Sequence, residues 1–188
     1  RRVLFRSGPE VAVASTKAFV AQITAAYLLG LYLAQVKGAM FRDEIHQMLD
    51  SLKDMPRKIQ WVLDTQPKTI QAAAERMVNA NSFLFLGRHV GYPVALEGAL
   101  KLKEIAYTFT EGFAAGELKH GPIALVDEGE PVVFIVPPQR GRNVLHAKVI
   151  SGIEEVKARG AYIIAVAEQG DPDVERYADV VFWRPACP

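Results

Sequence analysis

Cysteine is almost absent from the chain, which has one, Cys187, among its 188 residues. A single cysteine cannot form an internal disulfide bond or a cysteine-rich metal site. The composition therefore suits a reducing compartment, and we expect a cytoplasmic protein. We also expect no metal and no other cofactor, because no pair of histidines has a metal-ligand spacing such as H-x-x-x-H.

An excess of charge of one sign is also missing. Lys and Arg number 22, Asp and Glu number 21, and the net charge is +1. This balance gives no support for nucleic acid or an anionic membrane as a partner. The longest apolar stretch, residues 18–36, contains Gln22, Thr24 and Gln35 and is interpreted as a buried helix rather than a membrane span.

The two ends of the sequence look cut. Residues 1–7 (RRVLFRS) resemble the translation of a sequencing adapter; a natural loop is the alternative, and we exclude them from fold reasoning. The C-terminal end follows a strand-like run, residues 179–183, without a closing helix. We interpret both ends as the limits of a fragment.

Half of all residues in the chain are hydrophobic, which is enough for a hydrophobic core. The pattern of the first 80 residues predicts helices. After a short extended run at residues 11–13, helices are predicted over residues 17–36, 41–63 and 67–79. Ser15 or Thr16 is expected to cap the first helix and Gly38 to end it. Pro56 is expected to start a new helix within the second range.

From residue 81 onward, strands and helices alternate. Strands are predicted over residues 82–87, 131–137, 162–167 and 179–183, and helices over residues 93–107 and 142–159. The strands are continuously apolar, which indicates an α/β fold with a parallel sheet covered on both faces. Ligands of such sheets bind beyond the carboxyl ends of the strands.

Charged residues in two segments could carry chemistry. Glu97, Lys101 and Glu104 are spaced i, i+4, i+7 on the helix of residues 93–107. They are either a solvated face or an acid/base array aimed into a cleft at the end of a strand. His120 follows a charged, glycine-punctuated turn and precedes Gly121, where an exposed imidazole could donate or accept a proton near neutral pH.

Four segments resemble glutamine–fructose-6-phosphate aminotransferase (isomerizing), the glucosamine-6-phosphate synthase family. They are residues 13–19, 86–88, 92–107 and 115–122, and the strings ALEGALKLKEI and AAGELKHGP are especially specific. The resemblance implies a flavodoxin-like, three-layer α/β SIS (sugar isomerase) domain with a parallel sheet, preceded by connecting helices. By the same resemblance, residues 8–38 end a first SIS domain, residues 39–70 connect, and residues 71–188 form a second SIS domain.

The resemblance also implies an activity. Members of this family convert fructose 6-phosphate and glutamine into glucosamine 6-phosphate and glutamate. Glu104 matches the acid/base that moves a proton between C1 and C2 of the sugar, and Glu97 and Lys101 match charged residues of the same site. His120 matches the histidine that opens the sugar ring in a neighbouring subunit, which implies a homodimer. Val13 and Ser15 match positions that contact the sugar.

Three parts of the family pattern are missing from this sequence: the glutaminase domain, the phosphate-binding loop of the first SIS domain, and the C-terminal lysine that forms an imine. The isolated fragment is therefore expected to be inactive. One alternative is an amino-sugar phosphate isomerase or deaminase without glutaminase. Another is a non-catalytic, phosphosugar-binding regulator, against which the presence of both Glu104 and His120 argues.

Overall fold

The computed structural model describes residue 9, residues 11–140 and residues 144–186. The expectation for residues 1–7 and the predicted helix start at residue 142 lie outside the described residues. The chain forms two compact units that divide after Pro56.

The first unit contains α1 (Lys17–Val36) and the first part of α2 (Arg42–Thr65). The bounds of α1 are those predicted, and Gly38 ends it with a left-handed φ of 64°. Thr16 precedes α1 but makes no side-chain cap hydrogen bond, because its backbone is helical rather than extended. Residues 12–14 form bends and residue 11 has no regular structure, so the extended run predicted over residues 11–13 is wrong.

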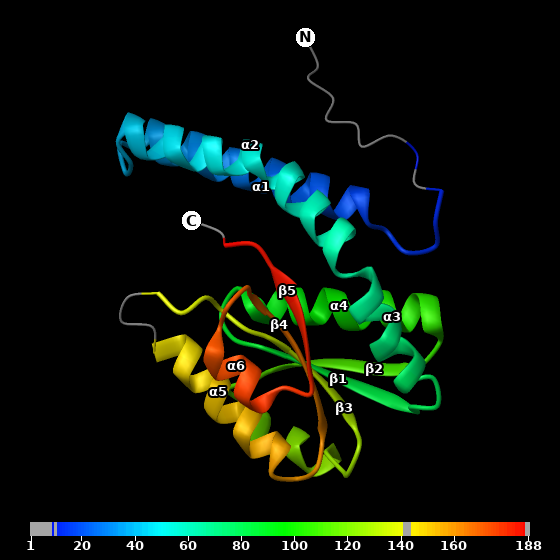
Figure 1. Cartoon of the computed structure of the whole chain (residues 1–188). Coiled ribbons are helices and arrows are strands. Elements are labelled where there is room, and N and C mark those ends of the chain that lie inside the picture. The colour runs from blue at the N-terminus through cyan, green and yellow to red at the C-terminus, as the bar shows by residue number, and fades with distance from the viewer. Residues whose placement is uncertain (1–8, 10, 141–143, 187–188) are drawn as a thin grey trace. The chain divides into compact units, whose positions relative to one another are not determined.

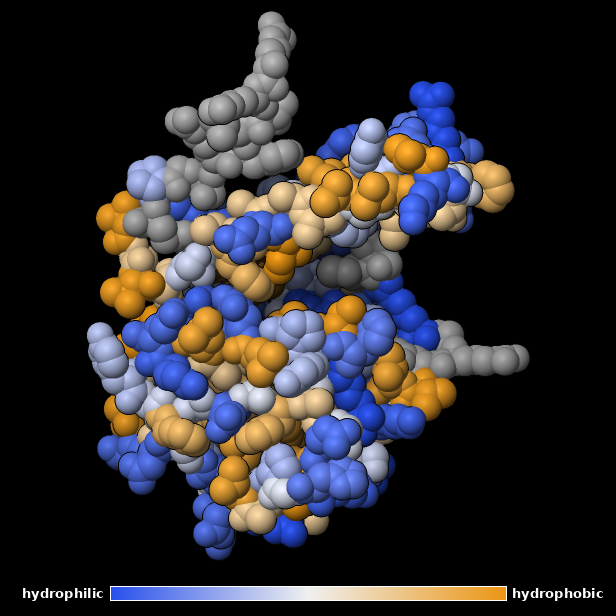
Figure 2. Space-filling view, turned by 180° about the vertical axis from the view of Figure 1, so that it is seen from behind, coloured by the Kyte–Doolittle hydropathy of each residue, from blue (hydrophilic) through white to orange (hydrophobic). Residues whose placement is uncertain are grey.

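Most of α1 is exposed within this chain. Only Leu31 of the helix is buried, and six large apolar residues are at least 47% exposed: Val20, Ile23, Leu29, Tyr32, Leu33 and Val36. Hydrophobic side chains are accordingly visible on the surface of the helical unit (Figure 2). The helix is therefore not buried within this chain by itself, and the prediction that it is buried stays a prediction for an assembly. By length and composition α1 could cross a membrane, which is weak evidence because core helices of soluble proteins pass the same test.

Helix α2 continues through Pro56, so the predicted start of a new helix at this residue is wrong. A proline inside a helix removes one backbone N–H donor and crowds the preceding turn. The 24-residue helix tolerates this loss because hydrogen-bonded turns continue on both sides. The proline nevertheless coincides with the division between the two units.

The second unit is a three-layer α/β domain. All strands of its five-stranded sheet are parallel, in the order β2-β1-β3-β4-β5. The strands are β1 (Ser82–Gly87), β2 (Phe109–Ala114), β3 (Pro131–Ile135), β4 (Tyr162–Glu168) and β5 (Val180–Arg184). Helices α3 (Pro67–Arg76) and α4 (Gly91–Ala106) cover one face, and α5 (Val144–Lys157) and α6 (Pro172–Tyr177) cover the other (Figure 1). The predicted fold class is confirmed.

The core lies between the sheet and its helices. Leu86, Val132, Phe134 and Ile163 of the strands are fully buried, together with Ile153 of α5. Burying a side chain of this size contributes about 1.5–3 kcal/mol, so the continuous apolar strands supply much of the driving force for folding. This burial explains why β1, β3, β4 and β5 could be predicted from the sequence.

Strand β2 was not predicted, nor were the short 3-10 helices η1 (Leu118–His120) and η2 (Pro122–Leu125). β2 is an edge strand with little apolar signal, and it contains Glu111 and Gly112. The glycine is required here, since a Cβ would lie 2.9 Å from Cδ2 of Leu96 on α4. The buried hydroxyl of Thr110 donates to the carbonyl oxygen of Ala99 at 2.7 Å and holds α4 on β2.

The sheet has a topological switch point at the end of β1. From β1 the chain passes through α4 to β2 on one side, whereas β3 pairs with the other side of β1. At this end Gly87 packs so tightly on α4 that a Cβ would lie 2.1 Å from the Gly91 carbonyl oxygen. In doubly wound sheets, ligands bind in the crevice at such a point.

Candidate functional site

The three charged residues predicted on α4 do come together. The Nζ of Lys101 lies 3.1 Å from Oε1 of Glu97 and 3.1 Å from Oε2 of Glu104. The three side chains are 21–34% exposed, so they are neither fully solvated nor sealed in the core. The hydrogen bond to Glu104, reinforced by Glu97, raises the pKa of Lys101 above its usual value.

The place of these residues differs from the expectation of a cleft at the carboxyl ends of the strands. Helix α4 runs back along the sheet, and its Ala99 is bonded to Thr110, the second residue of β2. Glu104 lies more than one further helical turn along α4 and is therefore near the amino ends of the strands. Ala95 and Ala99 of α4 are buried, whereas Ala106 at the end of the helix is exposed.

His120 lies on the other side of the sheet from these carboxylates. It ends η1, where its backbone N–H donates to the Glu117 carbonyl oxygen at 2.9 Å, and it is exposed. The neighbouring Lys119 pairs with Glu155 of α5 at 2.8 Å, and α5 covers the face opposite α4 (Figure 1). Within a single chain the sheet therefore separates His120 from Glu104, and the role of His120 in a neighbouring subunit stays a prediction.

Val13 and Ser15, the two predicted sugar-contacting residues, belong to the first unit. They precede α1, in a segment without regular structure. Val13 is 80% exposed, and Ser15 is half-buried.

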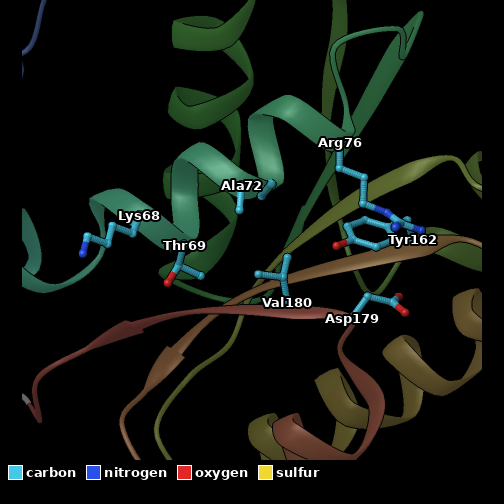
Figure 3. Close-up of a pocket in the computed structure, with 8 residues that line it drawn as sticks. Lys68, Thr69, Ala72, Arg76, Tyr162, Asp179 and Val180 are labelled. Carbon is cyan, nitrogen blue, oxygen red and sulfur yellow. The ribbon is translucent and has the colours of Figure 1, made fainter.

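A pocket of about 600 Å³ lies between α3 and the strands β4 and β5 (Figure 3). Two of its three charged groups, those of Arg76 and Asp179, make contacts within the chain: the guanidinium of Arg76 lies 4.6 Å from the centre of the Tyr162 ring. Asp179 accepts hydrogen bonds from Lys157 and from the backbone N–H of Ile163. These contacts hold α3 and the start of β5 on the sheet, which is a structural role.

A buried histidine–aspartate pair was missed by sequence reasoning. Nε2 of His146 lies 2.7 Å from Oδ2 of Asp171, and both side chains are less than 5% exposed. Oδ1 of Asp171 accepts the backbone N–H groups of Asp173 and Val174 and caps α6. The pair thereby ties α5 to α6. The Asp-Pro start of α6 was a readable capping signal, but the 25-residue separation from His146 hid the partner.

The same region contains the one cluster of potential metal ligands among the described residues. Ligand atoms of His146, Asp171 and Asp173 lie within 4.8 Å of one another. The expectation of no metal rests on the spacing of histidines along the sequence. Such spacing cannot reveal a cluster whose histidine and aspartates are 25 or more residues apart. Since both oxygens of Asp171 already accept hydrogen bonds, the cluster is accounted for as a helix cap and a clamp.

Relatives with known names match almost the whole chain. Glutamine–fructose-6-phosphate aminotransferase (isomerizing) of Corynebacterium efficiens is 63% identical over 182 residues, which cover 97% of this chain. The same enzyme of Streptomyces coelicolor is 55% identical over the same length. The resemblance stated from the sequence is confirmed. The chain spans 29% of the length of these relatives.

Solved structures share the fold. The C-terminal domain of glucosamine-fructose-6-phosphate aminotransferase from Francisella tularensis has a TM-score of 0.86 and 36% identity, covering 96% of this chain and 50% of that one. The sugar isomerase domain of an RpiR transcription factor from Sphaerobacter thermophilus has a TM-score of 0.55 at 18% identity, a likeness of fold alone.

The sequence model of the SIS domain matches residues 76–186, which is more than half of the chain and includes the whole five-stranded sheet. The parallel α/β architecture agrees with this match. The chain therefore belongs to the SIS domain family.

Proposed function

We propose that the chain is the isomerase part of an enzyme that converts fructose 6-phosphate and glutamine into glucosamine 6-phosphate and glutamate. The observation that carries the proposal is the Glu97–Lys101–Glu104 array, which combines two carboxylates and one ammonium group on half-exposed side chains. Its chemistry suits an aldose–ketose interconversion, in which a proton moves between adjacent carbons. The 63% identity to a relative named for this reaction supports the assignment.

Glu104 is the acid/base in this proposal. Within the described chain its side chain is bonded only to Lys101, through Oε2, so Oε1 is left to accept the C1 or C2 proton of the sugar. Lys101 remains protonated because its pKa is raised, and it can stabilise negative charge that develops on a sugar oxygen during proton transfer. Glu97 holds the ammonium group from the other side.

His120 acts in the site of a second chain, where it opens the sugar ring. Its exposure and its place across the sheet from Glu104 support a role between subunits rather than within one. Each complete site then requires a homodimer. An imidazole can both donate and accept a proton, which suits an exchange with the ring oxygen.

The proposal also covers the residues that contact the sugar, the domain boundaries and the cellular location. Val13 and Ser15 contact the sugar, residues 8–38 end a first SIS domain, residues 39–70 connect, and residues 71–188 form the second SIS domain. The family match over residues 76–186 supports the last assignment. A cytoplasmic location is supported by the scarcity of cysteine.

The test uses the intact protein that contains this chain. It is incubated with fructose 6-phosphate and either glutamine or ammonia, and glucosamine 6-phosphate is measured. Glu104→Gln should abolish product formation and leave glutamine hydrolysis unchanged. The matched control is Glu175→Gln, an exposed carboxylate on α6 across the sheet, which should retain full activity.

Each outcome decides between the candidates. Product formed with glutamine supports the proposal, whereas product formed with ammonia alone favours an isomerase without glutaminase. Sugar phosphate binding without product favours a regulator. Synthesis at a near-normal rate in Glu104→Gln would show that the role given to Glu104 is wrong.

A further inference from the structure

A second cavity lies across the sheet from α4. It has a volume of about 260 Å³ and is enclosed by the end of β1, the segment that follows β2, and one side of α5. It adjoins the switch point at the end of β1, where doubly wound sheets bind ligands. We propose that this cavity binds a small phosphorylated anion through Arg88 and Lys148.

The charge of the cavity favours an anion. Three cationic side chains line it, Arg88, Lys119 and Lys148, against one carboxylate, Glu155. Glu155 pairs with Lys119 at 2.8 Å and thereby neutralises one of the cations. Arg88 and Lys148 remain as two positive charges without a carboxylate partner among the described residues. Ser151 adds a hydroxyl group to the wall.

Arg88 is the residue that indicates a ligand. Its Nε is the one buried side-chain nitrogen or oxygen in the described part of the chain that has no hydrogen-bond partner. A buried N–H group without a partner costs about 1–3 kcal/mol, so such groups are rare. The only hydrogen bond of the guanidinium within the described chain is a long one, 3.5 Å, from NH2 to the carbonyl oxygen of Ala115. Most of its donors therefore remain for a ligand.

The local backbone leaves room for this guanidinium. A Cβ on Gly116 would come within 3.3 Å of an Arg88 terminal nitrogen, so glycine allows the arginine to lie along the cavity wall. A planar guanidinium that offers parallel donors is well matched to phosphate oxygens. The volume limits the ligand to a molecule about the size of a sugar phosphate or smaller. This site goes beyond the proposed function, whose residues lie on α4.

The test titrates the 188-residue chain with inorganic phosphate and with fructose 6-phosphate at constant ionic strength set with chloride. Amide resonances of Gly116 and Gly152 report on the cavity, and those of α4 report on the proposed isomerase site. We expect saturable shifts at Gly116 and Gly152. Lys148→Met and Arg88→Met should each weaken binding at least about tenfold, as expected for loss of a charged hydrogen bond.

Lys103→Met is the matched control, because Lys103 is an exposed lysine on α4, away from the cavity. It should leave the affinity unchanged. Absence of saturable binding, shifts confined to α4, or equal weakening in Lys103→Met would each overturn the proposal. Lys148 is exposed, so its variant remains decisive even if Arg88→Met folds poorly. Tighter binding of fructose 6-phosphate than of phosphate would support a phosphosugar ligand, and equal binding would support free phosphate.

Glu104→Gln separates the two proposals. It should abolish synthesis in the intact protein and leave phosphate binding at Gly116 and Gly152 unchanged. If the isomerase assignment fails, phosphate binding in the cavity can still be observed. If the cavity binds no phosphate, the isomerase assignment is unaffected.

Discussion

Lys101 donates a 3.1 Å hydrogen bond from Nζ to Oε2 of Glu104, and this contact holds an ammonium group beside a carboxylate on α4. The bond raises the pKa of Lys101, so the lysine stays charged near neutral pH. In the proposed reaction, Glu104 would move the proton and Lys101 would stabilise the negative charge that results.

Replacing Lys101 by methionine in the intact protein should lower the rate of glucosamine 6-phosphate synthesis about 10²–10³-fold, because the charge that stabilises a sugar oxyanion is lost. Glutamine hydrolysis should not change. Lys103→Met, two residues along the same helix, provides the control. Equal rates for the two variants would show that Lys101 takes no part in the reaction.

The same contact gives a pH dependence. A lysine whose pKa is raised in the folded protein contributes stability below its usual pKa, and this contribution is lost only as the pH rises through the raised value. The difference in unfolding free energy between the native chain and Lys101→Met should therefore be constant between about pH 7 and pH 9. Urea denaturation across this range tests the expectation, and a difference that disappears by pH 9 would contradict it.

Thr110 positions α4 on the sheet through the hydrogen bond of its buried hydroxyl to Ala99. Thr110→Val should lower the free energy of unfolding by about 1 kcal/mol, the usual net value of one buried hydrogen bond. Thr108→Val, an exposed change two residues earlier, should have less than about half that effect. If both variants unfold at the same urea concentration as the native chain, Thr110 does not hold the helix in place.

Asp171 combines a helix cap with a buried partner for His146. Asp171→Ala should cost about 2–4 kcal/mol of stability, since the cap is lost and a buried imidazole loses its partner. Asp173→Ala removes the exposed contact with Gln139 and leaves the Asp171–His146 pair in place, so it should cost less than about 1 kcal/mol. Chemical denaturation of both variants measures the difference, and an equal cost would contradict the buried clamp.

The sequence predicted the elements that contain continuous apolar runs and missed those that lack such a run. β1 and α1 have the bounds expected from their apolar residues. β2 was missed because Glu111 and Gly112 are poor strand formers, and a parallel neighbour on one side holds this edge strand in place. The exposure of α1 could not be foreseen, since an apolar helix indicates burial without indicating in which chain.

For the site, helical spacing predicted that Glu97, Lys101 and Glu104 would meet, and they do. Spacing could not show that Glu104 lies near the amino ends of the strands or that the sheet separates it from His120. Those facts depend on the direction in which α4 runs back over β2. The cavity at Arg88 was equally hidden, because its residues come from three separate segments.

Gly121 shapes the turn that follows His120. Its φ of 141° is unfavourable for any residue with a Cβ, so Gly121→Ala should lower stability by about 1–3 kcal/mol. Gly152→Ala on α5 is the control. Its Cβ would make an ordinary 3.7 Å contact with Phe134, and an alanine within a helix should be neutral or gain about 0.5–1 kcal/mol. Urea unfolding of both variants measures the change in the free energy of unfolding, which should be negative for Gly121→Ala and zero or positive for Gly152→Ala.

The position of His120 across the sheet from Glu104 gives a test of site sharing. His120→Ala and Glu104→Gln in the intact protein should each be inactive alone. If the histidine serves the partner's site, co-refolding equal amounts of the two variants yields mixed dimers in which one of the two sites has both native residues. Statistical mixing then restores about a quarter of the native synthesis rate for a two-fold dimer. If both residues serve one chain, every site in the mixture lacks one of them and no activity returns, so the synthesis rate after mixing decides between a shared and an unshared site.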